Sequence, residues 1–181
     1  MSRALSRPSL ALLLALVAAP TAIASGPSNA VIKAAIRDAE RSKDLWATVN
    51  MCNLPSSHPK GNKLVGVRVQ MPALGFTSQL YFSVEMQYWS ETNKAFVASG
   101  IRFGPSLISS ARHAPHQGGV VFPFKPPVVG QKFTVRGLVA FEWRLGKRVL
   151  GRTIRKTGHG YKHVDFSKPP GYNAGTCTIT P

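Results

Sequence analysis

Hydrophobic side chains occupy every second position through much of the chain after residue 45, and a period of two is typical of half-buried β-strands. In the clearest runs, apolar residues alternate with polar ones over residues 63–71, 79–89 and 131–144. Shorter or weaker runs lie at residues 46–53, 95–98, 120–124, 148–156 and 176–180. Turn sequences rich in Gly, Pro, Asn and Ser separate them, so the pattern predicts seven to nine short antiparallel strands.

One segment before the strands has a helical period instead. Ser28 can cap a helix over residues 29–43, in which one apolar stripe contains Val31, Ile32, Ala35, Ile36 and Ala39. A helix this short must pack against the domain to be stable. The expected fold is all-β: an antiparallel immunoglobulin-like or fibronectin-like β-sandwich of 7–9 strands with a short N-terminal helix. Alternation alone leaves a partly closed barrel open as the other architecture.

The first 24 residues differ from the rest and are typical of a secretory signal. Arg3 and Arg7 precede a short apolar run at residues 10–19, and small residues at 22–24 suit a signal peptidase. The run is about half of the ~20 residues that span a bilayer, and no later segment is apolar enough to do so. We therefore expect a cleaved signal peptide at 1–24, a helical leader at 25–45 and a β-domain at 46–181, in a protein that is secreted or associated with the cell envelope. Retention of the signal as an anchor is the alternative.

The two cysteines, Cys52 and Cys177, both lie in the predicted β-domain. In an oxidising compartment an even pair is usually a disulfide. Free thiols in a redox or metal site are the competing interpretation, but the pair lacks C-x-x-C spacing. We expect a Cys52–Cys177 disulfide that joins an early strand to the last one.

Three segments carry a resemblance to a known group of proteins. They are Leu45-Trp-Ala-Thr-Val-Asn-Met-Cys-Asn-Leu-Pro55, Gly66-Val-Arg-Val-Gln-Met-Pro72 and Val139-Ala-Phe-Glu-Trp-Arg144, followed by a late single cysteine. Over about Trp46 to the end, the chain resembles small secreted proteins of high-GC Gram-positive bacteria. The resemblance implies an exported β-domain. It implies no activity and transfers no functional residue.

The composition is strongly basic, with 23 Lys and Arg against 7 Asp and Glu and a formal charge of +16. Arg3 and Arg7 lie in the predicted signal and all acidic residues follow it, so the exported chain would carry +14. This charge predicts attraction to anionic wall polymers, acidic lipid surfaces, polysaccharides or nucleic acid, although charge also serves solubility. Nucleic acid is disfavoured, because the aromatic residues fall mostly on the buried parity and the expected compartment is extracellular.

A basic run around the last predicted hairpin is the candidate binding face: Arg144, Lys147, Arg148, Arg152, Arg155 and Lys156. Arg148, Arg152 and Lys156 share strand parity and could meet regularly spaced anions. Leu150 and Ile154 have the same parity, however, and basic side chains also protect edge strands from aggregation. The expected partner is an anionic cell-wall polymer or polysaccharide, and an unidentified protein partner is the alternative.

Four histidines in two loops are the candidate metal ligands: His113, His116, His159 and His163. Imidazoles bind zinc or copper when three or four converge, whereas separate solvated histidines are the ordinary alternative. No cofactor is expected. The carboxylates Glu85 and Glu142 fall on the polar parity of their strands, where exposed ion pairs explain them.

Neither a G-x-S-x-G elbow nor an evident acid–base pair marks the chain as an enzyme. The sequence therefore predicts a non-enzymatic exported binding or structural module. A secreted enzyme with a site built from the histidine loops is one alternative. A protein–protein interaction module without a polyanion ligand is the other.

Overall fold

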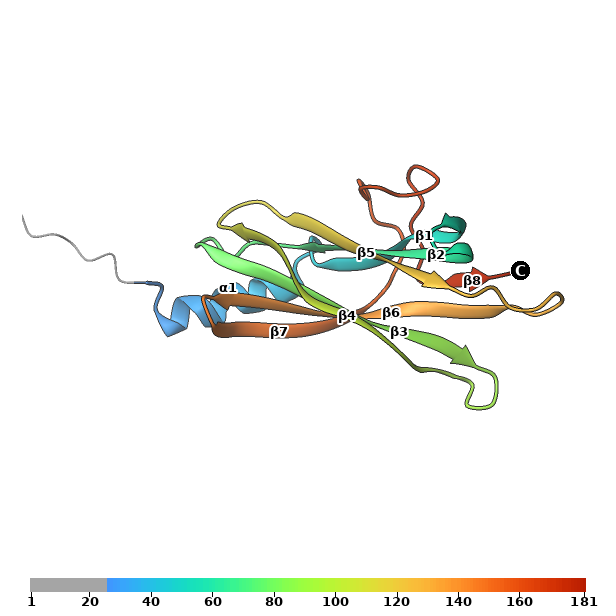
Figure 1. The fold of residues 1–181 in the computed structure, drawn as a ribbon. Coiled ribbons are helices and arrows are strands. Elements are labelled where there is room, and N and C mark those ends of the chain that lie inside the picture. The colour runs from blue at the N-terminus through green and yellow to red at the C-terminus, as the bar shows by residue number, and fades with distance from the viewer. Residues whose placement is uncertain (1–25) are drawn as a thin grey trace, which may run out of the picture.

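A computed structural model describes residues 26–181, which form one helix and eight strands in two packed antiparallel sheets (Figure 1). The elements are α1 (Asn29–Arg41), β1 (Trp46–Ser57), β2 (Lys60–Met71), β3 (Ser78–Ser90), β4 (Ala95–Ala111), β5 (His116–Phe124), β6 (Phe133–Leu145), β7 (Arg148–Lys156) and β8 (Cys177–Ile179). The predicted all-β class and the N-terminal helix are confirmed. The predicted signal lies outside the described residues. Within residues 26–181, no helix is long and apolar enough to cross a membrane.

The two sheets differ in size. The smaller sheet has the order β1-β2-β5, and the larger has the order β4-β3-β6-β7, with β8 also paired to β6. Strands β1–β2, β3–β4 and β6–β7 form hairpins within a sheet, whereas the connections β2–β3, β4–β5 and β5–β6 cross between the sheets. Each sheet consequently has one face on the core and one outer face.

The core lies between the sheets and contains the alternating residues that the sequence pattern predicts. Val65, Val67 and Val69 of β2 are fully buried, as is Trp143 of β6. The indole nitrogen of Trp143 donates to the carbonyl oxygen of Pro72 at 2.9 Å. The largest side chain of the core thus buries its ring with its polar atom satisfied.

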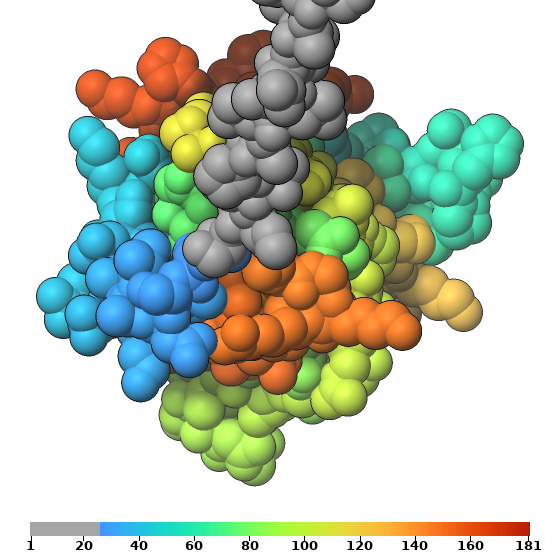
Figure 2. All heavy atoms as spheres, turned by 90° about the vertical axis from the view of Figure 1, so that its left-hand side faces the viewer, coloured from blue at the N-terminus to red at the C-terminus, as the bar shows by residue number. Residues whose placement is uncertain are grey.

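Helix α1 covers the core beside β7, and Figure 2 shows it against the β6–β7 hairpin. Ile36 of α1 is buried where Gly151 of β7 makes room for it, since a β-carbon at Gly151 would lie 2.7 Å from Ile36 atoms. The Arg155 guanidinium donates to the carbonyl oxygen of Glu40 at 2.7 Å. Apolar packing and this hydrogen bond together hold a helix that would be marginal alone.

The connection between β7 and β8, residues 157–176 (hereafter the strap), crosses the outer face of the three-stranded sheet. The buried side chain of Asn50 in β1 donates to the carbonyl oxygens of Asp165 and Phe166 at 3.2 and 3.1 Å. At the far strand, Gln117 of β5 donates to the carbonyl oxygen of His163 at 2.7 Å. The predicted irregular connection is therefore ordered by side chains of the sheet beneath it.

Replacing Asn50 with Ala should loosen the strap, because two carbonyl oxygens lose their donor. We expect a loss of about 1–3 kcal/mol in the free energy of unfolding and faster amide hydrogen exchange over residues 157–176. Asn93→Ala, in the exposed β3–β4 turn, is the control and should change stability by less than about 0.5 kcal/mol. Unchanged exchange in the strap of the Asn50 variant would contradict this account.

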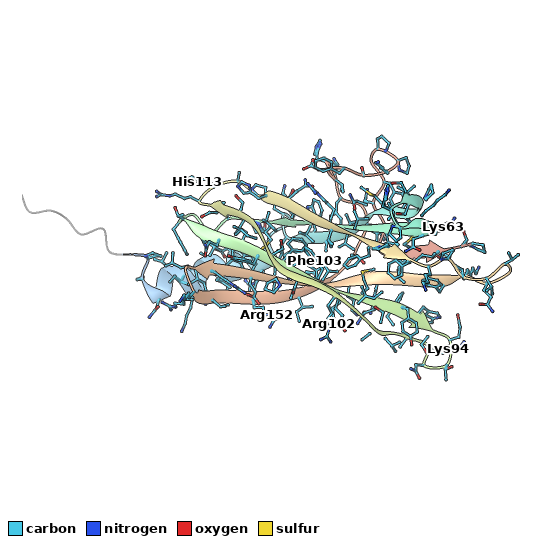
Figure 3. The ribbon with its side chains drawn as sticks, viewed as in Figure 1. Lys63, Lys94, Arg102, Phe103, His113 and Arg152 are labelled. Atoms are coloured by element: carbon cyan, nitrogen blue, oxygen red, sulfur yellow. A yellow bond between two sulfur atoms is a disulfide. The ribbon has the colours of Figure 1, made fainter. Side chains whose placement is uncertain are left out.

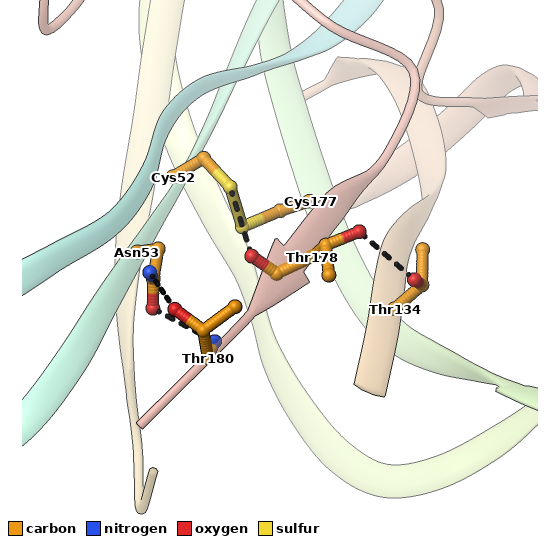
Figure 4. The surroundings of a disulfide bond; sticks show 6 residues. All are labelled: Cys52, Asn53, Thr134, Cys177, Thr178 and Thr180. Carbon is orange, nitrogen blue, oxygen red and sulfur yellow. Dashed lines mark hydrogen bonds between the residues drawn. A yellow bond between two sulfur atoms is a disulfide. The ribbon is translucent and has the colours of Figure 1, made fainter. Parts of the chain in front are cut away.

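The predicted disulfide between Cys52 and Cys177 is present, with the Cα atoms 5.4 Å apart (Figure 4). It joins β1 of one sheet to β8 of the other. Beside it, the Asn53 side chain donates to the Thr180 hydroxyl at 2.7 Å. The bond thus fixes the two sheets to each other at one end of the sandwich.

The double substitution Cys52→Ala and Cys177→Ala should destabilise the protein strongly. The cysteines are 125 residues apart, and closing a loop of that length in the unfolded chain is worth about 5 kcal/mol in the chain-entropy model. We expect a loss of about 3–5 kcal/mol in urea unfolding. The reduced wild-type protein should match the variant, and a loss below about 1 kcal/mol would show that the closed loop contributes little.

Candidate functional site

A groove of about 380 Å³ runs over the outer face of the five-stranded sheet. Side chains from β3, β4, β6 and β7 line it. Ser83 of β3 lies opposite Ala140 of β6, and Ala140 lies opposite Ile154 of β7. Because these side chains are short or apolar, they leave a depression in the middle of the sheet, and its floor is largely apolar. We call this depression the outer groove.

Strand β4 forms one wall of the outer groove, and it bends there at Gly104. The backbone of Gly104 has φ +90°, and a β-carbon would lie 2.7 Å from the carbonyl oxygen of Phe82. The ladder between β3 and β4 also shifts register between Phe82 and Val84. Only glycine combines this backbone conformation with so close an approach of two strands.

Glu142 lies at one end of the groove and binds two arginines. Arg144 donates to its carboxylate through Nε at 2.9 Å and also through Nη2, while Arg152 Nε lies 3.5 Å from the other oxygen. The Arg144 guanidinium also stacks on the Tyr81 ring, 4.4 Å from its centroid. The predicted Glu142–Arg144 pair is present, as part of a larger cluster.

Glu85 lies at the other end, where Arg102 Nε contacts its carboxylate at 3.2 Å. Glu142 faces Tyr81 and Glu85 faces Leu138, so the two acids are four positions apart along β3. That spacing corresponds to roughly 13 Å between backbone positions along the strand, and each carboxylate contacts arginines of its own. The acids are thus ion-paired, as expected, but both carboxylates are shielded and not exposed, and Glu142 binds two arginines.

Two further basic side chains, Arg136 and Lys156, lie on this outer face. Arg136 of β6 stacks on Phe96 at 4.0 Å and donates to Gln87 at 2.8 Å, and desolvation lowers the pKa of its guanidinium from the ordinary value. Lys156 of β7 is exposed opposite Leu138. Figure 3 shows Arg102 and Arg152 on the same side of the larger sheet. The basic set of this face is therefore Arg102, Arg136, Arg144, Arg152 and Lys156.

The predicted basic hairpin face is divided by the structure. Arg144, Arg152 and Lys156 belong to the outer face, and Lys147 lies in the exposed β6–β7 turn. Arg148 does not share their side, because a register shift between Trp143 and Arg144 places it opposite Leu145. The expectation of one parity for Arg148, Arg152 and Lys156 is therefore wrong at Arg148.

Two members of the predicted set contact α1 instead. Arg148 donates to the side-chain oxygen of Asn29 at 3.1 Å, and Arg155 donates to the carbonyl oxygen of Glu40 at 2.7 Å. Conversely, Arg102 and Arg136 lie on the outer face but do not belong to the predicted basic run. Arg136 could have been found, since it has the same polar parity as Glu142. Arg102 lies where the alternation is broken by the irregular β4.

The four candidate metal ligands do not form a metal site. His113 lies at the end of the sandwich near the β4–β5 loop, His116 begins β5, and His159 and His163 lie in the strap (Figure 3). Across residues 26–181, no group of three or more His, Cys, Asp or Glu side chains is placed to hold a metal ion. His113, His159 and His163 are exposed loop residues, whereas His116 is a partly buried strand residue.

No family model, curated protein or solved structure matches this chain. The chemistry of the outer groove is therefore the basis on which a function can be inferred. Its two arginine–glutamate clusters flank an apolar floor, and it lies on the broad face of the larger sheet. Such a surface can bind a ring on its floor and anionic groups at its ends.

Substituting Gly104 with Ala should displace β4 from its position in the groove wall, because the added β-carbon clashes with the carbonyl oxygen of Phe82. We expect a loss of about 2–4 kcal/mol in the free energy of unfolding, combining backbone strain with the clash. Gly61→Ala is the matched control, since Gly61 also has a positive φ but open space around it. It should lose only about 1 kcal/mol, and equal losses would contradict the role of the close approach.

Proposed function

We propose that this protein is an exported, non-enzymatic binding module that binds an anionic extracellular polymer across the outer face of its five-stranded sheet. The observation that carries the proposal is a difference in exposure. The side chains of Arg102 and Arg152 are 72% and 58% exposed, whereas those of Glu85 and Glu142 are 27% and 15% exposed. A ligand that approaches this face therefore meets guanidinium groups before it meets carboxylates.

The geometry of the arginines favours carboxylate, sulfate or phosphate groups. Arg102 and Arg152 each contact their glutamate through Nε, so the two terminal nitrogens are the atoms offered to a ligand. A guanidinium presents paired donors that match the oxygens of these anions. The glutamates hold the guanidiniums in position and lower the entropy lost on binding.

The apolar floor favours a polymer that contains rings. Ala140 and Ile154 lie side by side on β6 and β7 between the two charged ends, and Leu138 lies beside Glu85 at one of them. One face of a sugar ring is mostly C–H and packs against such a surface, while its acidic substituents reach the arginines. An anionic polysaccharide thus satisfies the floor and the ends together, and the net positive charge steers it to the protein.

Export is supported by residues 1–24, in which basic, apolar and small residues follow one another as in a secretory signal. The Cys52–Cys177 disulfide also supports it, since such bonds persist in oxidising compartments. We also propose that the sandwich is immunoglobulin-like or fibronectin-like. Its neighbour relations support this: β2 beside β5, β3 beside β6 and β6 beside β7 correspond to strands B–E, C–F and F–G of that architecture. The disulfide differs, because it joins β1 to β8.

Sedimentation with purified cell walls rich in anionic polymer tests the function. We expect binding that falls steeply with salt, because each ionic contact releases a counterion. Arg102→Gln with Arg152→Gln should weaken binding by about tenfold or more. The matched control, Lys162→Gln with Lys168→Gln, removes the same charge from the strap over the other sheet and should change binding little.

Two results would oppose the proposal. Equal weakening by both double variants would show that only net charge attracts the polymer. Binding that is insensitive to salt and to the arginine substitutions would favour a protein–protein module without a polyanion ligand.

A further inference from the structure

The β5–β6 loop, residues 125–132, projects beyond the end of the sandwich (Figure 1). Its sequence, Lys-Pro-Pro-Val-Val-Gly-Gln-Lys, places apolar residues at the tip and a lysine at each end. Val128 and Val129 are 66% and 91% exposed. Apolar residues scattered singly on a surface are ordinary, but two adjacent ones at a projecting tip form a contact surface.

The backbone of the loop holds this tip away from the domain. Pro126 and Pro127 have fixed φ angles and no N–H to donate. The Gln131 N–H donates to the carbonyl oxygen of Val128 at 3.0 Å, and Gly130 has φ +86°, as the third residue of a type II turn requires. Val129 is therefore at the apex of a defined turn.

The base of the loop is closed by aromatic packing. The rings of Phe124 and Phe133 lie 6.1 Å apart where β5 ends and β6 begins. Phe124 is buried and Phe133 partly buried, and both pack with the core. The loop is thus anchored at its base and exposed at its tip.

Four lysines lie at the ends of the loop or in the neighbouring β1–β2 hairpin, and we call them the lysine collar: Lys60, Lys63, Lys125 and Lys132. Lys125 and Lys132 flank the loop, Lys63 lies opposite Phe124 in the sheet, and Lys60 is at the tip of the β1–β2 hairpin. Glu91, in the turn between β3 and β4, is paired with Lys94 at 2.9 Å. The end of the domain that carries the tip is therefore positively charged.

We propose that this end of the domain docks on an anionic lipid bilayer, with Val128 and Val129 entering the interface and the lysine collar contacting the lipid phosphates. A polyanion in water offers the valines no apolar environment, whereas a bilayer interface offers it next to negative charge. Lysine side chains suit this position, since their stems lie along apolar surface while the ammonium groups stay at the headgroups. A bilayer interface thus accommodates both the exposed valines and the lysine collar.

Docking of this kind is weak and reversible when either signal acts alone, because two valines bury little area, and stable anchoring requires two signals. The apolar tip and the charge are those two signals here. The strands would stand upright on the bilayer, and the outer groove would face sideways and remain free. The inference does not depend on the groove, so it can fail or succeed independently of the polymer-binding proposal.

A fluorescent probe at the tip gives a local test in the full chain. The native cysteines are paired, so Val128→Cys provides the one reactive thiol among the described residues for an environment-sensitive dye. We expect a blue shift with vesicles of phosphatidylglycerol and phosphatidylcholine, and none with phosphatidylcholine alone. The same dye at His113→Cys, at the opposite end of the domain (Figure 3), should not shift. A tip probe that stays in water on bound vesicles, or that shifts equally on neutral vesicles, would overturn the proposal.

Substitutions then separate the two signals. Val128→Ser with Val129→Ser should lower vesicle affinity by about tenfold, and Lys125→Gln with Lys132→Gln by about fivefold for each lysine. Val31→Ser with Val121→Ser removes two other exposed valines and is the matched control. All variants carry the same N-terminal residues, so differences belong to the loop. Affinity unaffected by the tip substitutions, or lowered equally by the control pair, would refute insertion of the valines.

Discussion

Strand β1 has β2 on one side only, and its other edge would present a row of backbone N–H and C=O groups to solvent. The strap covers that edge: Val49 and Ala174 exchange two backbone hydrogen bonds at 2.9 and 3.0 Å, and the Gly158 N–H donates to Ala47 at 2.8 Å. The Thr48 hydroxyl, fully buried, donates to Gly158 as well. Covering this edge determines the path of the chain after β7, the position of β8 and therefore the position of Cys177.

Closure of the β1 side has a consequence for the outer surfaces. The strap occupies part of the outer face of the smaller sheet, and α1 covers the core beside β7, so the outer face of the larger sheet is the broad surface left to solvent. On that surface the two acids are shielded and five basic side chains remain. The fold thus places these five basic side chains on one open face, where Arg102 and Arg152 are more accessible than the two acids.

The alternation of apolar residues was sufficient for β2, β3 and β6, because their buried parity continues through the regular β2–β5 and β3–β6 ladders. It failed in β4, where bulges and the bend at Gly104 break the period and hide Arg102. It also failed at Arg148, because the register shift next to Arg144 reverses the side that the strand presents. The Cys52–Cys177 pair was predictable from composition and compartment alone. The strap was not, since contacts such as Asn50 to Asp165 join a side chain to distant backbone and leave no periodic trace.

The long separation of Cys52 from Cys177 in the sequence also affects the order in which parts of the fold can form. β1 is made early, but the segment that covers its edge and the cysteine that locks it come 125 residues later. Until then an emerging chain carries an open strand edge, which is prone to pairing with other chains. Contacts this distant in sequence also slow folding. The domain must therefore complete its fold after its synthesis, and during that interval its neighbours determine whether it folds or aggregates.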